Sequence, residues 1–157
     1  MYKIELVQGP KDIIAFENFR IKSFAPKSGK IKEIYESQVA TDIAGEEVKA
    51  YAIKKDSKTV GGMVIRPLNN VEHALKLEYL FVNKPERGNG IASLALDYLA
   101  VNREKFFPNC KEILIKVTPK SCDFYERRGY TIMNADTYEE RGLDKKSEGP
   151  LMQKTYR

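Results

Sequence analysis

The chain has 157 residues, a formal net charge of +5, 42% hydrophobic residues and 31% charged residues. This size and composition predict one globular domain over residues 1–157, with a core large enough to need no disulfide scaffold. No apolar run approaches the ~20 residues of a membrane span, and the N-terminus lacks a signal-peptide core, so we expect a cytoplasmic protein with no membrane partner.

Charge and cysteine content narrow the classes of ligand. The positive balance favours anionic ligands, but no basic stripe interleaved with aromatics occurs, which argues against a nucleic-acid partner. The two cysteines, Cys110 and Cys122, and the single histidine form neither a disulfide framework nor a zinc pattern. We therefore expect reduced thiols and no metal site.

Hydrophobic periodicity along the chain changes several times between the helical and the strand period. Gly45 and Pro26 end helical stretches, and Asp56-Ser57 predicts the turn of a hairpin whose second strand contains Gly61-Gly62, typical of a bulge or a close backbone approach. Residues 134–148 are predicted to form a long charged connection. In chain order the predicted elements are a strand at 2–7, helices at 11–24 and 31–44, strands at 48–54, 59–65 and 74–82, a helix that begins at 91 and ends before Pro108, a strand at 112–117, a helix at 119–128 opened by a Thr118 cap, and strands at 130–133 and 151–156.

One stretch combines a strand, a glycine turn and a helix start. The apolar run 77–82 ends before Pro85, then Gly88 and Gly90 precede a helical pattern that begins at Ile91. Glycines in such a turn let successive N–H groups point inward, and the helix N-terminus adds partial positive charge. The stretch therefore predicts an anion site, although a plain strand-to-helix turn would also use glycines.

The spacing excludes two common anion motifs. Ser93 stands where the dinucleotide fingerprint needs its third Gly or Ala, and no P-loop sequence occurs. Instead, Arg87-Gly88-Asn89-Gly90-Ile91-Ala92 resembles the acetyl-CoA signature [QR]-x-x-G-x-[GA] of the GCN5-related N-acetyltransferases. Downstream, Phe124-Tyr125-Glu126-Arg127-Arg128-Gly129-Tyr130 is similar to the F-Y-e-k-x-G-[FY] segment of the same family. The two matches occur in the family's order and at a family-like separation.

The resemblance implies a fold and a reaction. The fold is mixed α/β, with a central, mostly antiparallel twisted sheet of six to seven strands flanked by about four helices. The reaction is transfer of an acetyl group from acetyl-CoA, the cosubstrate, to an amine of a small molecule or of a protein or peptide. Direct attack without a metal is implied, and dimers are common in the family, which adds a homodimer to the implied partners.

The resemblance also assigns residues to the coenzyme. Backbone N–H groups of the glycine loop are expected to hold the pyrophosphate, and pantetheine is expected to bond main chain like an added strand. A backbone N–H around Val82 is expected to face the oxyanion. The coenzyme-binding residues implied in this way are Phe81, Val82, Arg87, Gly88, Asn89, Gly90, Ile91 and Ala92.

Two side chains are implied as catalytic. Tyr125 is the expected proton donor to the leaving thiolate, with a core aromatic or a positioning role as the alternative. Glu78, an acidic residue inside an apolar strand, is the expected general base, with a solvated face or a salt bridge as the alternative.

Other features of the sequence leave the function and the substrate undecided. Thr118-Pro119 occupies a region where many family members carry an asparagine, which puts that standard contact in doubt. The regions expected to build the acceptor site, 24–44 and 134–148, carry charges of both signs and indicate no substrate. The alternatives are a non-catalytic acyl-CoA-binding sensor or interaction module on the same fold, and an unrelated nucleotide- or phosphate-binding protein.

Overall fold

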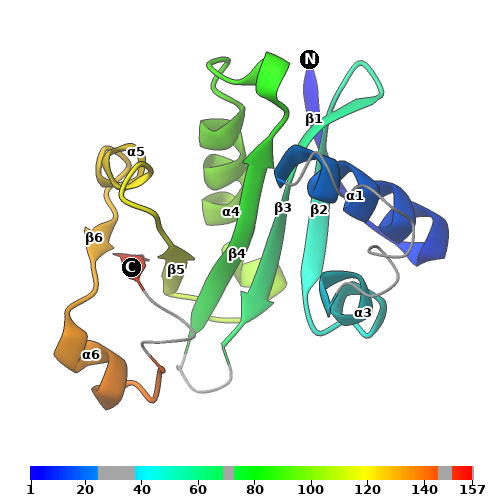
Figure 1. The fold of residues 1–157 in the computed structure, drawn as a ribbon. Coiled ribbons are helices and arrows are strands. Elements are labelled where there is room, and N and C mark those ends of the chain that lie inside the picture. Colours follow the sequence, from blue (N-terminus) through cyan, green and yellow to red (C-terminus); the bar gives the residue numbers. More distant parts are fainter. Residues whose placement is uncertain (25–37, 69–72, 145–149, 157) are drawn as a thin grey trace. The chain divides into compact units, whose positions relative to one another are not determined.

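The computed structural model describes residues 1–24, 38–68, 73–144 and 150–156 (Figure 1). The described residues form a mixed α/β fold around a seven-stranded sheet of order β1-β2-β3-β4-β5-β7-β6. β1–β2, β2–β3, β5–β7 and β6–β7 pair antiparallel, and β4–β5 pair parallel. The elements are β1 Tyr2–Leu6, α1 Gly9–Phe24, α3 Gln38–Ala44, β2 Lys49–Lys55, β3 Lys58–Pro67, β4 Ala74–Val82, the 3-10 turn η1 Lys84–Glu86, α4 Ile91–Phe106, β5 Glu112–Lys116, α5 Cys122–Glu126, β6 Thr131–Ile132, α6 Ala135–Glu140 and β7 Leu151–Thr155.

This architecture confirms the predicted fold class, and two local predictions were wrong. The helix predicted from 119 begins only at Cys122, because Ser121 accepts a hydrogen bond from the Thr118 backbone N–H and donates to the Thr118 carbonyl, which closes a separate turn. Within the predicted connection 134–148, α6 forms and buries Tyr138. Residues 31–37 of the second predicted helix and residues 145–148 of the connection lie outside the described residues.

The described chain forms two compact units. Unit 1 comprises Met1–Ile65 and Tyr79–Ala100, and unit 2 comprises Arg66–Glu78 and Val101–Arg157. The prediction of a single domain over 1–157 stays a prediction.

Unit 1 is a three-layered unit. Because side chains alternate along a strand, Ala50 and Ala52 of β2 face one side, where they pack with Ile13 of α1 and Ile43 of α3. The intervening Tyr51 faces the other side and contacts Tyr98 of α4, with ring centroids 5.8 Å apart. Figure 1 shows α1 and α3 next to each other beside these strands.

The paired glycines of β3 serve the core of unit 1. A Cβ on Gly61 would lie 2.6 Å from the Phe81 carbonyl oxygen, and a Cβ on Gly62 would lie 2.6 Å from the ring of Phe16 and 2.7 Å from the ring of Phe81. The pairing of β2 with β3 also shifts register after Ile53. Of the two predicted reasons for the glycines, the close backbone approach is confirmed at Gly61, and the register irregularity falls at the neighbouring Val60.

Unit 2 has its own core, centred on β5 and β7. Leu114 of β5 and Leu151 of β7 pack with Tyr138 of α6. The Leu151 backbone N–H also donates to the Tyr138 hydroxyl at 2.7 Å in a buried environment. The short α6 is thus anchored through one aromatic residue, a tertiary effect that the charged sequence around it does not indicate.

None of the helices in the described part of the chain has both the length and the apolar character needed to span a bilayer.

The glycine contacts give a stability prediction. Gly62→Ala should destabilise the protein by about 1–3 kcal/mol, because the added methyl overpacks two core rings. Gly45→Ala is the matched control, since the atom nearest to its added Cβ is the Thr41 carbonyl oxygen at an ordinary 3.4 Å. Urea unfolding of both variants measures the difference, and equal stabilities would contradict the packing described here.

Candidate functional site

The predicted coenzyme loop begins where β4 ends. After Val82, the Asn83 N–H donates to the Val60 carbonyl at 2.7 Å, which ties the start of the loop to β3. Pro85 lies in the first positions of η1, where its missing N–H costs no helical hydrogen bond. The first turn of α4 is closed by the Leu94 N–H, which donates to the Gly90 carbonyl at 3.0 Å. Strand, glycine loop and helix start occur as predicted.

Both loop glycines adopt backbone conformations that suit only glycine well. The φ angle is +88° at Gly88 and +77° at Gly90. A Cβ built on either residue meets no atom of the described chain within 4 Å. Glycine is therefore required here by conformation, and the space above the loop is open to a ligand.

The side chains of the predicted coenzyme residues have different surroundings. Arg87 is exposed, and its Nε donates to the Val82 carbonyl at 3.0 Å, so its side chain closes the loop back onto β4. Phe81 is only 4% exposed, and its ring packs on Phe16 and Phe19. Ile91 is likewise buried. Phe81 and Ile91 can therefore offer a ligand only their main chain, whereas Gly88, Asn89 and Gly90 are exposed and Val82 and Ala92 half-buried.

The strand next to this loop runs beyond its pairing with β5. β4 pairs with β5 from Ala74 to Leu77, and it continues through Glu78 to Val82. The predicted main-chain contacts with pantetheine fall on this continuation.

Tyr125 occupies a defined turn in unit 2. Its carbonyl accepts a hydrogen bond from the Tyr130 N–H at 3.1 Å, and the Glu126 carbonyl accepts from the Gly129 N–H at 3.0 Å. With φ +89° at Gly129, these bonds form a Schellman motif at the end of α5. The contact that accompanies such motifs joins Tyr130 and Tyr125, whose rings meet edge-to-face at 5.8 Å. The F-Y-x-x-x-G-Y spacing thus has a physical reason, because it places one tyrosine against the other.

The Tyr125 side chain is buried except near its hydroxyl. The residue is 8% exposed, and its ring also packs edge-to-face on Phe124 at 5.1 Å. The Tyr125 hydroxyl forms no hydrogen bond with a residue that the structure describes. Among the described residues, every fully buried side-chain nitrogen or oxygen has a hydrogen-bond partner. The hydroxyl oxygen of Tyr125 is therefore not fully buried and reaches the surface. Burial raises the pKa of Tyr125 to about 12, against a smaller opposing effect of Arg128. Tyr125 therefore carries its proton at neutral pH.

Glu78 lies in an ion-pair cluster of unit 2. One carboxylate oxygen accepts from Arg66 Nε at 3.0 Å, and the other lies 3.6 Å from Lys76 Nζ. The Lys76 side chain is 4% exposed and that of Glu78 is 22% exposed. Of the predicted alternatives for Glu78, the structure shows the salt bridge. To accept a proton, the carboxylate would have to break its contact with Arg66 or Lys76, or act while still paired. Lys76 and Glu78 share a strand face, a signal the sequence offered, whereas Arg66 comes from β3.

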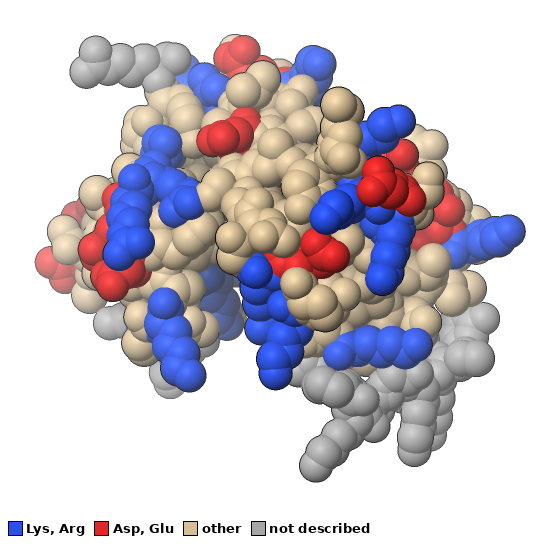
Figure 2. All heavy atoms as spheres, turned by 90° about the horizontal axis from the view of Figure 1, so that it is seen from above, with Lys and Arg blue, Asp and Glu red and all other residues tan. Residues whose placement is uncertain are grey.

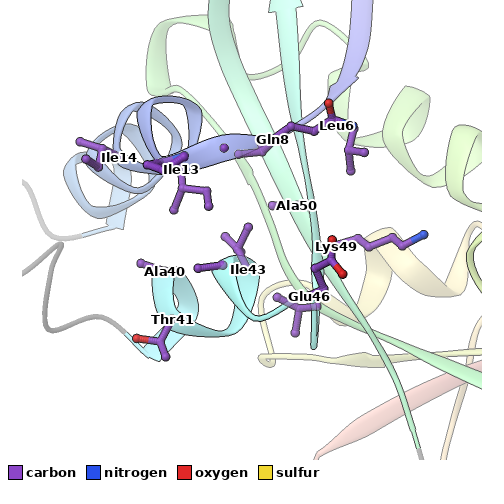
Figure 3. Close-up of a pocket in the computed structure, with 15 residues that line it drawn as sticks. Leu6, Gln8, Ile13, Ile14, Ala40, Thr41, Ile43, Glu46, Lys49 and Ala50 are labelled. Atoms are coloured by element: carbon purple, nitrogen blue, oxygen red, sulfur yellow. The ribbon is translucent and has the colours of Figure 1, made fainter.

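A separate pocket of about 820 Å³ opens elsewhere in unit 1 (Figure 3). Ile13 of α1 and Ile43 of α3 point into it over Ala50 of β2, and none of the predicted coenzyme residues lines it. Ala50 pairs with Val64, whereas the glycine loop is tied to Val60 further along β3. This pocket is therefore distinct from the predicted loop.

Charges of both signs occur together on one face of the molecule. Figure 2 shows lysine and arginine side chains interspersed with carboxylates on the face it displays. Among the residues that the structure describes, no group of three or more His, Cys, Asp or Glu side chains is placed to hold a metal ion. The predicted absence of a metal stays a prediction.

The structure combines a mixed α/β fold, a glycine loop between a strand and a helix, and a tyrosine held by a Schellman motif. These are the features of the acetyltransferase class that the sequence resembles. The family model "Acetyltransferase (GNAT) domain" matches residues 24–145. This chain belongs to the GNAT acetyltransferase family. No curated protein matches it significantly.

Solved structures share the fold at low sequence identity. Tetrahymena GCN5 has a TM-score of 0.71 at 16% identity, over 99% of this chain and 96% of that chain. The PaiA N-acetyltransferase of Thermoplasma acidophilum, in complex with coenzyme A, has 0.63 at 15%, over 99% of each chain. The N-acetylglutamate synthase of Neisseria gonorrhoeae, with coenzyme A and N-acetyl-glutamate, has 0.67 at 12%, over all of this chain and 35% of that chain. At these identities the likeness shows the fold.

The burial of Tyr125 predicts a pH effect. Its folded pKa of about 12 lies above the ordinary 10, so its stabilising contribution is complete below pH 10 and is lost as the pH rises through about 12. Between about pH 9 and about pH 11.5 the wild type should lose up to about 2 kcal/mol more stability than Tyr125→Phe. Urea unfolding at both pH values measures this, and identical pH dependence of the two proteins would refute the burial argument.

Proposed function

We propose that this chain transfers the acetyl group of acetyl-CoA to an amine by direct attack. The observation that carries the proposal is the loop of Gly88 and Gly90. Its two positive φ angles and the open space above it suit a backbone cradle for a pyrophosphate at the start of a long helix. Membership of the GNAT family supports the proposal, and so does the coenzyme A in two structural neighbours.

The loop and β4 supply the grip on the coenzyme. Bound acetyl-CoA brings the acetyl group as a reactive thioester. Backbone N–H groups from Gly88 to Ala92 bind the pyrophosphate, and the main chain of Phe81 and Val82 bonds pantetheine. Arg87 holds the loop against the Val82 carbonyl, which supports its shape without any ligand.

Tyr125 and Glu78 supply the proton steps. The amine nitrogen bonds the acetyl carbon as the carbon–sulfur bond breaks, so one proton leaves the nitrogen and one reaches the sulfur. Tyr125 gives its proton to the leaving thiolate, a role supported by its accessible hydroxyl and its protonated state at neutral pH. Glu78 receives the proton of the amine through water.

A second candidate is an acyl-CoA-binding sensor on the same fold. The observation that favours it is the pairing of both Glu78 oxygens with Arg66 and Lys76, which occupies the proposed base. Under the first proposal, the acceptor is an amine of a small molecule or of a protein or peptide. A panel that contains both kinds of amine screens for the acceptor.

Coenzyme binding is the first test. Calorimetric titration should give a Kd for acetyl-CoA of about 1 μM or tighter, on the order of −8 kcal/mol, with ATP and NAD as negative controls. Gly90→Asp should weaken binding at least about tenfold, because it places a Cβ and a negative charge above the loop. Gly9→Asp is the matched control, since Gly9 has φ +79° and equally open surroundings. Absence of acetyl-CoA binding by the folded protein would remove both the enzyme and the sensor.

Turnover separates the two candidates. Tyr125→Phe should lower kcat about 100-fold and Glu78→Gln by a similar factor, with the Kd for acetyl-CoA little changed. Tyr2→Phe, the same chemical change on β1, should leave the rate at its wild-type value. Coenzyme binding without turnover on any amine of the panel would favour the sensor, and a wild-type rate in Glu78→Gln would remove Glu78 as the base.

A further inference from the structure

The Arg128 carbonyl lies in the turn that follows α5 and receives no hydrogen bond from the Schellman motif. Within the motif, Tyr125 and Glu126 receive hydrogen bonds from N–H groups of the following residues. The Arg128 carbonyl instead accepts from Lys154 Nζ of β7 at 2.7 Å in a partly buried position. A lysine far away in the sequence thus binds a carbonyl at the negative end of the helix that carries Tyr125.

The strand register explains why Lys154 meets this turn. β6 pairs antiparallel with β7, with Thr131 opposite Gln153 and Ile132 opposite Met152. Continuing the register by one residue brings Tyr130 to Lys154. Gly129 leaves room for the lysine stem, because a Cβ there would lie 3.3 Å from the Lys154 Cε.

The ammonium of Lys154 is held by carbonyl and ring contacts. Nζ lies 5.7 Å from the centroid of Tyr130 and 5.5 Å from that of Tyr156, within the range of cation–π attraction. Among the described residues, no carboxylate forms an ion pair with it. Because Tyr130 packs edge-to-face on Tyr125, the ammonium holds both the backbone and the ring that fix Tyr125.

We propose that Lys154 is a positioning residue that holds the Tyr125 side chain in place for proton transfer. It acts on Tyr125 through the Arg128 carbonyl and the Tyr130 ring. The kinetic test of this proposal rests on the proposed function, because it needs turnover. The spectroscopic test rests only on the contacts of Lys154. It assigns a role to a strand that neither sequence motif includes.

The kinetic test is a double-mutant cycle. Lys154→Met keeps a stem of similar length but loses the donor, and it should lower kcat at least about tenfold with the KM for acetyl-CoA within about twofold. Lys154→Arg, which can still donate to the carbonyl, should recover part of the rate. Lys116→Met removes an exposed lysine of β5 and is the matched control. In a Tyr125→Phe background, Lys154→Met should cost nothing further, because the residue it positions has lost its hydroxyl.

The outcomes separate this proposal from its premise. An equal loss of rate in both backgrounds, or none in either, would overturn the positioning role. If the wild type turns over no amine, ¹³C-tyrosine NMR carries the test, with the Tyr125 resonance assigned through Tyr125→Phe. Movement of that resonance in Lys154→Met but not in Lys116→Met would support the role, and an unchanged resonance would overturn it whatever the protein catalyses.

Discussion

The packing of Phe81 fixes the end of β4, and through it the glycine loop. Its ring fills the space that Gly62 leaves open and lies against Phe16 and Phe19 of α1. With this residue anchored, the next two positions are set by backbone and side-chain bonds, from Asn83 to Val60 and from Arg87 to Val82. The loop is therefore shaped by the hydrophobic core of unit 1 before any ligand arrives, and a preshaped loop loses little conformational entropy on binding.

In unit 2, contacts from outside α5 hold a single side chain, Tyr125, in place. α5 spans only Cys122–Glu126, too short to be stable by its own hydrogen bonds. Its end is fixed by the Schellman turn at Gly129, by the ring of Tyr130 and by the ammonium of Lys154. A short helix held from three sides can present Tyr125 with a buried ring and an accessible hydroxyl.

Glycine has two different roles in this protein, and the structure distinguishes them. Gly61 and Gly62 lie in an extended strand, where the absent side chain makes room for Phe81. Gly88 and Gly90 face open space, and their positive φ is what excludes other residues. The first kind serves stability, whereas the second kind belongs to the proposed coenzyme site.

Local sequence by itself determined the class of fold, the strand–glycine–helix loop and the turn after α5, because turn chemistry and hydrophobic period depend on neighbouring residues. The family resemblance rested on those same stretches. Sequence did not determine what depends on residues distant along the chain. Only the tertiary structure paired Glu78 with Arg66, whereas the sequence left a general base, a solvated face and a salt bridge open for this carboxylate. It also folded α6 around Tyr138, through a bond to β7, and placed Lys154 under the turn of Tyr125. These contacts follow from strand register, and register is decided by the packing of the whole sheet.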